Sequence, residues 1–498
     1  MRNYTLVFLL MAGTFFIQAQ SDADKVRATI SKNDIEAHIY FLASDELRGR
    51  ATGSAEIDIA ASYLGNSLRR YGVKPAGDNG SYYQQVKFEK VSPPESIEMN
   101  MKSLNLSEFI NMKVSEINLE GDAIFLGYGS KEDFEKHDVK GKLVLTFAGN
   151  EGATEMMQSY RAGMKKREMA EKAGALALVE IVSLSDPEKA SMAHHFNESR
   201  VTVESKTGES QFVHLWGLAE PDAEMPKLKM GADKPVELSI KGIAKESMGG
   251  RNVLGYLEGT DPELKEEFIV YSAHYDHVGV GKPNAEMDSI YNGARDNAVG
   301  TVTVLNAAEN IAKYPTRRSS LFIFFTGEEK GLLGSKYFVE NPTIALDKVV
   351  YCFNSDNGGY NDTSKTTILG LHRTTAGKHF IEAAAEFGLT AIDDPAPEQN
   401  LFDRSDNVHF AKKGVPAPTY SMGFNAFDEE ITKYYHQVTD NPDTMDYDYL
   451  YKFFQSYVLS ARLIANDPER PFWTEGDKYY EAGKKLYAKQ KEEVKILD

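Results

Sequence analysis

The sequence of 498 residues contains a single cysteine, Cys352. One cysteine excludes an intrachain disulfide and any CxxC motif for zinc binding or redox chemistry. Because Cys352 lies within the apolar run KVVYCFN, we expect it to be a buried, small hydrophobic side chain.

Basic residues are scarce relative to acidic ones. The chain has 56 Lys and Arg against 74 Asp and Glu, which gives a formal net charge of -18. A negative surface repels phosphate backbones and anionic lipid, so we expect no nucleic-acid partner. Apolar residues make up 42% of the chain, which is enough for ordinary globular cores. The sequence also lacks internal repeats and low-complexity tracts.

Long apolar runs are absent apart from residues 4–17. Residues 1–20 combine Arg2, this run and the small residue Ala19, a pattern typical of a secretory signal peptide cleaved near Gln20. A transmembrane anchor is disfavoured because the run is shorter than the ~20 residues that span a bilayer. We therefore expect an exported protein, periplasmic or secreted, with no stable membrane anchor. Without disulfides, such a protein needs a large core or bound metal for its stability.

The length favours several domains, at about 100 to 200 residues each. Residues 35–71 have apolar positions at helical intervals, interrupted by the stretch ELRGRATGS. Residues 93–249 change to short β-like runs such as AIFLGY and KLVLTF. From residue 252 onward, apolar strands alternate with helices, which predicts an α/β fold with a mostly parallel, mixed sheet flanked by helices. In such sheets the chemistry lies just beyond the carboxyl ends of the strands.

Histidine or carboxylate residues follow almost every strand predicted in the second half of the chain. Because the carboxyl ends of parallel strands share one edge of a sheet, these side chains should converge. The residues are His274 and Asp276 after FIVYSA, Asp296 in NGARDNAVG, Glu328 and Glu329 after LFIFFTG, Asp356 after VVYCFNS, and His436 in KYYHQVTDNPDTMD.

Buried carboxylates at one sheet edge need a compensating charge. Asp296, Glu329 and Asp356 would carry three negative charges, which two divalent cations would offset. Mixed imidazole and carboxylate donors suit Zn²⁺, with Co²⁺ or Mn²⁺ as substitutes, and disfavour Ca²⁺. Two metals about 3.5 to 4 Å apart can share one water, lower its pKa and stabilise the oxyanion of a tetrahedral intermediate. The chemistry that this pattern predicts is hydrolysis of an amide.

Five motifs occur in one order along the chain: SAHYDHVG, NGARDNAVGTV, TGEEKGLLGS, NSDNGG and YYHQVTDNPD. In this order they resemble the co-catalytic dinuclear zinc aminopeptidases. That family includes secreted bacterial leucyl-type aminopeptidases and is related to glutamate carboxypeptidase and the transferrin receptor. The resemblance implies a zinc-exopeptidase, phosphorylase/hydrolase-like catalytic domain over residues 21–95 and 248–498. It also implies an inserted β-rich domain of the protease-associated (PA) type over residues 96–247.

The resemblance further implies a role for each residue of the cluster. Asp296 would bridge two Zn²⁺ ions per chain, and the peptide bond from Asp296 to Asn297 would be cis. Glu328 would be the general base that takes a proton from the water shared by the metals and passes it to the leaving amine. The other ligands would be His274 and Asp356 on one ion, and Glu329 and His436 on the second, with Asp276 orienting His274.

The residues alone leave several points open. They do not decide whether Glu328 or Glu329 is the base. Arg295 stands where the family usually has Asp or Asn, and it either pairs with a nearby carboxylate or alters access for the substrate. His277 is expected to be a neighbour of the site that packs or hydrogen-bonds. Asp406 either lies behind the site or near the substrate amine, or it caps a helix.

The expected activity is that of an aminopeptidase acting on peptides with a free N-terminus. The same metal site would also suit a carboxypeptidase, a dipeptidase or a glutaminyl cyclase. A non-catalytic binding protein on this scaffold is disfavoured because all five ligands and Glu328 are retained. A serine hydrolase or an HExxH metalloprotease is disfavoured because neither G-x-S-x-G nor HExxH occurs in the sequence.

Overall fold

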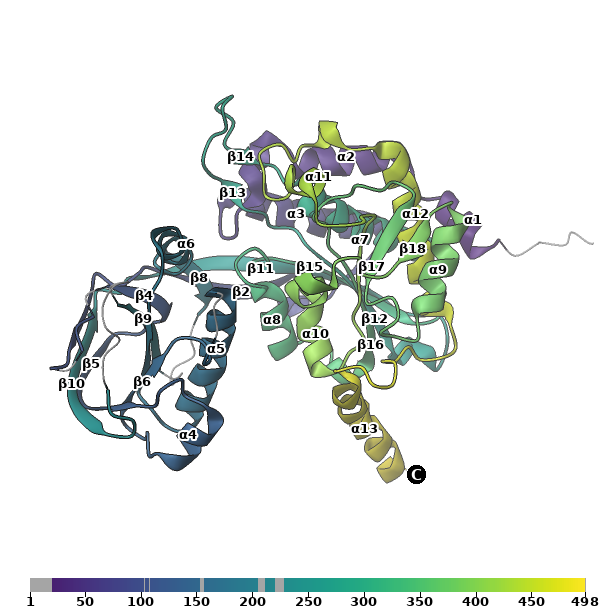
Figure 1. Ribbon diagram of the computed structural model, residues 1–498. Coiled ribbons are helices and arrows are strands. Elements are labelled where there is room, and N and C mark those ends of the chain that lie inside the picture. Colours follow the sequence, from purple (N-terminus) through teal and green to yellow (C-terminus); the bar gives the residue numbers. More distant parts are fainter. Residues whose placement is uncertain are drawn as a thin grey trace, which may run out of the picture. The chain divides into compact units, whose positions relative to one another are not determined.

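The structure, a computed structural model, describes residues 20–102, 104–106, 108–152, 156–204, 211–219 and 228–497 (Figure 1). The predicted signal peptide therefore falls almost wholly outside the described residues. The chain divides into two compact units, one formed by Met1–Val86 and Gly250–Asp498 and the other by Lys87–Gly249. These divisions lie near the predicted ones, and the PA type of the second unit stays a prediction. No described helix is both long and apolar enough to cross a bilayer.

The first unit is built on one mixed sheet with the strand order β18-β17-β19-β16-β12-β15-β11. Strand β12 pairs in parallel with both β15 and β16, and β16 pairs in parallel with β19. Strands β11 and β17 run antiparallel to their neighbours β15 and β19. The predicted α/β fold is thus confirmed. The strands are β11 (Lys245–Leu257), β12 (Phe268–His274), β15 (Ser319–Phe325), β16 (Val349–Ser355), β17 (Lys365–Leu369), β18 (Thr390–Ile392) and β19 (Thr419–Met422), with β1 (Lys74–Pro75) paired to β11.

Helices bury both faces of this sheet, which explains its continuous apolar strand sequences (Figure 1). Tyr271 and Phe322 point to a core shared with α3, α7, α9 and α12. Val270 and Ile323 point to the opposite core, which is shared with α8 and α10. The helices are α1 (Asp22–Arg27), α2 (Lys32–Leu42), α3 (Ala55–Tyr71), α7 (Gly300–Lys313), α8 (Leu333–Glu340), α9 (Gly377–Glu386), α10 (Asn407–Lys413), α11 (Glu429–Thr432), α12 (Tyr447–Asn466) and α13 (Tyr480–Leu497).

Two segments near the N-terminus and after β12 matter for the site. Helices α2 and α3 are capped at their N-termini by Ser31 and Ser54, whose hydroxyls accept hydrogen bonds from the N–H groups of Asp34 and Ile57. Residues 43–54 connect these helices. A two-stranded hairpin, β13 (Gly279–Val280) and β14 (Ile290–Tyr291), lies between β12 and α7.

The second unit has its own sheet, with the strand order β3-β10-β5-β6-β7-β9-β4. Its four central strands, β5, β6, β7 and β9, are parallel, and the outer strands are antiparallel. The elements are β3 (Ser96–Asn100), β4 (Phe109–Lys113), β5 (Ile117–Phe125), α4 (Lys131–Lys136), β6 (Leu143–Phe147), α5 (Met156–Lys172), β7 (Ala177–Val182), α6 (Asp186–Phe196), β9 (Val213–Leu218) and β10 (Asp233–Lys241). Strands β2 (Tyr83–Val91) and β8 (Arg200–Val203) pair with each other and are not part of this sheet.

A fully buried ionic network ties α5 to this second sheet. The Glu180 carboxylate contacts the Lys166 ammonium and accepts hydrogen bonds from His214 Nε2 at 2.9 Å and Trp216 Nε1 at 2.8 Å. Burial lowers the pKa of His214, so its ring is neutral and donates through Nε2. Gly163 permits the approach of α5, because a Cβ there would lie 2.3 Å from Glu180 Oε2.

We expect Lys166→Met to destabilise the second unit by about 3 to 5 kcal/mol, because it leaves Glu180 buried without a cation. The chain has two tryptophans, and Trp216 is the one in this unit. Urea unfolding followed by Trp216 fluorescence in a Trp473→Phe background therefore reports on the unit. Lys131→Met is the control, since it breaks only the exposed pair with Glu135. Equal midpoints for the two variants would contradict a stabilising role for the network.

Candidate active site

The predicted site residues come together at the carboxyl edge of the sheet in the first unit. His274 is the last residue of β12, and Asp356 directly follows the last residue of β16. Glu328 and Glu329 follow β15, the other neighbour of β12. Because these three strands are adjacent and parallel, their ends meet at one place.

Asp296 reaches the same place from a buried turn that precedes α7. The peptide bond between Asp296 and Asn297 is cis, as the family resemblance implies. The Asp440 carboxylate accepts hydrogen bonds from the N–H groups of Arg295 and Asp296 at 3.0 and 3.2 Å. Asp440 lies four residues after His436, so it joins the turn of Asp296 to the loop of His436.

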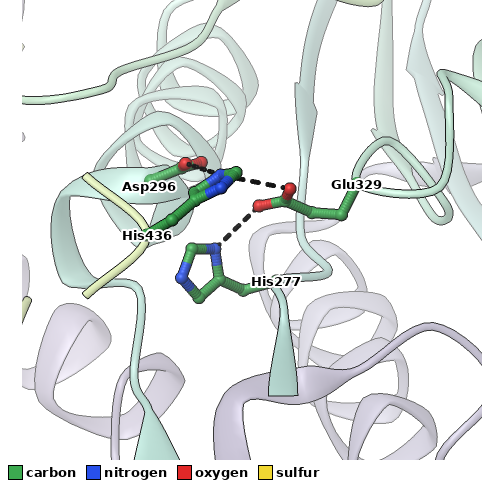
Figure 2. A group of neighbouring side chains, drawn as sticks. All are labelled: His277, Asp296, Glu329 and His436. Carbon is green, nitrogen blue, oxygen red and sulfur yellow. Dashed lines mark hydrogen bonds and ion pairs between the residues drawn. The ribbon is translucent and has the colours of Figure 1, made fainter. Parts of the chain in front are cut away.

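The two oxygens of Asp296 face two separate imidazoles. Oδ1 lies 3.3 Å from His274 Nε2, and Oδ2 lies 3.1 Å from His436 Nε2. His274 Nε2 is also 3.2 Å from Asp356 Oδ1, and His436 Nε2 is 3.2 Å from Glu329 Oε2. Each imidazole is therefore flanked by its own carboxylate, and both share Asp296. The second of these halves is drawn in Figure 2.

His277 completes this second half, as Figure 2 shows. Its Nδ1 lies 2.8 Å from Glu329 Oε1, while the other oxygen of Glu329 faces His436. The expectation that His277 hydrogen-bonds beside the site is confirmed, although its partner could not be named from the sequence. His277 fixes the orientation of the Glu329 carboxylate.

Asp276 holds the loop that carries both glutamates. Its carboxylate accepts hydrogen bonds from the N–H groups of Glu328 at 3.1 Å and Glu329 at 3.3 Å. The side chain of Asp276 is 3.8 Å from His274 Nδ1, whereas its backbone carbonyl oxygen is 3.2 Å from that atom. Orientation of His274 thus comes mainly from the carbonyl of Asp276, and its carboxylate orders the next loop.

Close carboxylates shift the titration of both imidazoles. Burial alone would lower the pKa of His274, but the charges of Glu328 and Asp356 hold it well above its ordinary value. Burial likewise opposes protonation of His436, yet hydrogen bonds to Asp296 and Glu329 raise its pKa to about 10. Burial raises the pKa of Asp296, and the bonds from His274 and His436 outweigh this and lower it well below its usual range. Without cations, protons on the imidazoles therefore balance the carboxylates.

Glu328 differs from the other acidic residues of the cluster. Burial, together with the negative charges of Asp356 and Glu329, raises its pKa well above the usual value, although His274 acts in the opposite direction. By contrast, hydrogen bonds from His277 and His436 lower the pKa of Glu329 to about 2, against the opposing effects of burial and Asp296. The pKa of Glu328 is thus raised, and that of the adjacent Glu329 is lowered. The sequence alone could not distinguish these two glutamates.

Asp406 is buried and does not cap its helix. It precedes α10, but its side chain makes no capping hydrogen bond. Neither of its oxygens has a hydrogen-bond partner of standard geometry among the described residues. Burial raises the pKa of Asp406 to about 7, although the charge of His274 opposes this rise. The helix-capping alternative for Asp406 is therefore wrong.

Arg295 pairs with a carboxylate, as one of the two alternatives for this residue stated. Its Nη1 lies 3.1 Å from Asp440 Oδ1, and its guanidinium lies 3.6 Å from the centre of the Tyr434 ring. Arg295 and Asp440 are both buried. Sequence reasoning gave Asp440 no role, although it lies inside the motif YYHQVTDNPD that carries His436.

The cluster opens into a cavity. Its polar wall contains His274, Asp296, Glu328, Glu329, Asp356 and His436. An apolar wall of the same cavity includes Leu369, Leu401, Phe424, Phe427 and Ile431, several of which form one small hydrophobic cluster. The cavity thus combines polar groups with an apolar lining, which is the usual make-up of a ligand site.

The donor set fits two divalent cations. The ligand atoms of His274, Asp296 and Asp356 lie within 4.8 Å of one another, and so do those of His277, Asp296, Glu329 and His436. Imidazole nitrogens and carboxylate oxygens are the donors that zinc and similar metals take in hydrolytic sites. The raised pKa values of the imidazoles also show that positive charge is favoured there.

Comparison with known proteins supports this chemistry. Residues 252–459 match the model of Peptidase family M28. Aminopeptidase YwaD of Bacillus subtilis is 24% identical over 450 residues, which cover 87% of each chain. Aminopeptidase Y of Saccharomyces cerevisiae is 22% identical over 43% of this chain and 38% of its own length.

A solved structure has the same fold. The aminopeptidase from Aneurinibacillus sp. strain AM-1 has a TM-score of 0.55 at 18% identity, and the match covers 90% of this chain and 97% of that one. The matched segment 252–459 contains all the cluster residues described above. Over residues 252–459 this chain is similar to peptidase family M28, and it is a metallopeptidase.

Proposed function

We propose that this chain is an exported, zinc-dependent aminopeptidase that removes N-terminal residues from peptides at a site for two metal ions. The observation that carries the proposal is the geometry of Asp296. One of its oxygens faces His274 and the other faces His436, and each imidazole has a second carboxylate beside it. His274 and Asp356 would hold one ion, Glu329 and His436 the other, and Asp296 both.

Two Zn²⁺ ions bound there would supply Lewis acidity, which activates a water and polarises the scissile carbonyl. The chain supplies the proton transfers. Glu328 lines the cavity, and its raised pKa means that it binds a proton readily. No described imidazole forms an ion pair with Glu328, so its carboxylate remains available. Glu328 would take a proton from the attacking water and return it to the leaving amine.

Two observations favour an aminopeptidase over the other enzymes that could use this site. Both relatives and the solved structure described above are named aminopeptidases. The apolar wall of the cavity, with Phe424, Phe427 and Ile431, suits an apolar N-terminal side chain beside the reacting bond. Export rests on the signal-like residues 1–20 alone.

We expect Glu328→Gln to reduce kcat by about 10² to 10⁴-fold while both metals remain bound. Glutamine has almost the same shape but cannot take a proton, so metal content by elemental analysis should be unchanged. Glu340→Gln, at the end of α8, is the matched control and should keep the parent rate. Hydrolysis of leucyl-nitroanilide by the Glu328 variant at the parent rate would show that another group is the base.

Substrates with a free N-terminal amine should be cleaved, and the same peptides with an acetylated amine should not. A panel of aminoacyl-nitroanilides and their acetylated forms tests this. Leucyl and phenylalanyl substrates should exceed glutamyl ones in kcat/KM because of the apolar wall. Equal rates on acetylated peptides, or cyclisation of N-terminal glutamine, would favour the alternative activities.

The melting temperature of the ion-free protein should fall as pH rises from about 6.5 to about 10. A histidine has a pKa of about 6.5 in the unfolded chain, whereas that of His436 is about 10 in the fold. Because its pKa is raised, protonated His436 contributes its full stabilisation of the fold below about pH 6.5. This stabilisation is lost as pH rises towards the pKa of about 10 that His436 has in the fold. The zinc-loaded protein should not show this fall, because its imidazoles are already neutral. Scanning calorimetry of both forms measures the melting temperature at each pH. The same pH dependence in both forms would contradict binding of zinc by His436.

A further inference from the structure

A segment outside the matched residues 252–459 lies against the metal cluster. Residues 48–50 form a turn in which Arg48, Gly49 and Arg50 all have positive φ, at 45°, 68° and 48°. A Cβ on Gly49 would lie 2.4 Å from the carbonyl oxygen of Tyr291 and 2.6 Å from that of Gly279. The turn is therefore wedged against the base of the hairpin β13–β14, which connects His274 to Asp296 in the chain. A left-handed conformation at non-glycine residues persists only where its surroundings enforce it.

The Arg50 side chain joins the two loops that flank this hairpin. It is 1% exposed, and its Nε donates to the carbonyl oxygen of Tyr275 at 2.9 Å. Nη1 donates to the carbonyl oxygens of Leu42 and, at 2.6 Å, of Asn292, and Nη2 donates to that of Gly293 at 3.1 Å. Tyr275 follows His274 directly, and Gly293 lies three residues before Asp296. One planar guanidinium thus sets the distance between the backbones that carry two of the proposed ligands.

Thr52 extends the same support to the third loop. Its hydroxyl donates to Asp276 Oδ2 at 2.7 Å. The Asp276 carboxylate in turn accepts from the N–H groups of Glu328 and Glu329. The backbone of the segment also takes part, because the N–H of His277 donates to the carbonyl oxygen of Arg50 at 3.2 Å. Residues 50–52 therefore reach every ligand-bearing loop except those of Asp356 and His436.

Arg50 also contributes a buried positive charge beside the carboxylates. Burial lowers its pKa to about 10, while the charges of Asp276 and Asp296 act in the opposite direction, so it remains cationic at neutral pH. The guanidinium of Arg50 donates its hydrogen bonds to backbone carbonyl oxygens and not to a single carboxylate. These bonds fix the position of its positive charge.

We propose that Arg50 and Thr52 are positioning residues for the metal centre, which set its affinity for metal by holding the loops of His274, Asp296 and Glu329 in register. The proposal rests on the two-metal site argued above. Partners of this kind around metal ligands typically change metal affinity by about 10 to 100-fold when they are removed. A merely structural role for the two residues would lower stability without changing the affinity of the folded protein for metal.

The test is a titration of the metal-free full chain with Co²⁺, followed by visible absorption. Arg50→Gln and Thr52→Val should each weaken Co²⁺ binding by about 10-fold or more and alter the absorption bands, whereas Thr52→Ser should restore both. The matched controls are Arg318→Gln and Thr316→Val. Arg318 is also 1% exposed, and it donates to backbone carbonyls at the end of β15 that lies away from the site. At the same end, the hydroxyl of Thr316 donates to the carbonyl oxygen of Arg318.

The controls should lower the melting temperature but keep the parent dissociation constants and spectrum. The proposal is overturned if Thr52→Val binds Co²⁺ as the parent does, or if Arg318→Gln weakens binding as much as Arg50→Gln. If Arg50→Gln does not fold, the comparison of Thr52→Val, Thr52→Ser and Thr316→Val still decides. A parent chain that binds no Co²⁺ would instead refute the metal centre itself.

Discussion

The site depends on one electrostatic constraint, which is the crowding of buried carboxylates at one edge of the sheet. Asp296 and Asp276 are almost completely buried, and Glu329 is close to Asp296 and to two histidines. Carboxylates this close repel one another and lose hydration, so the fold must supply positive charge. Imidazole protons and the buried Arg50 supply part of it, and two cations would supply the rest. The same repulsion would favour the binding of metal cations at this edge.

Hydrogen bonds from backbone to two carboxylates keep the crowded residues in place. Asp276 accepts from the loop of Glu328 and Glu329, and Asp440 accepts from the turn of Asp296. Neither carboxylate needs to touch a metal to control where the ligands stand. An anion that accepts two or three N–H groups is both satisfied and rigid, which limits how far the loops can spread when no cation is present.

The sheet, its parallel order and the edge that carries the cluster could be predicted from the sequence, because apolar strands such as FIVYSA end directly in ligand residues. What could not be predicted were the partners that fix these ligands. Arg50 and the carbonyl of Tyr275 are separated by 225 residues, and Asp440 and Arg295 by 145. No local pattern encodes such pairs, since they depend on how the chain packs. The difference between Glu328 and Glu329 also arises from packing, because only Glu329 lies between two imidazoles.

The segment that matches the family model depends on residues outside it. Residues 252–459 contain every proposed ligand, yet their core is completed by α2 and α3, whose Ile39, Ile57 and Leu64 pack in the same cluster as Tyr271 and Val302. The connection between these two helices is the one that carries Arg50 and Thr52. Burying the apolar faces of α2 and α3 against the sheet thus forces their connecting turn onto the loops of the metal cluster. Packing of the core thus helps to position the proposed ligands. A substitution that shifts α2 relative to α3 should therefore also move the loops of the cluster.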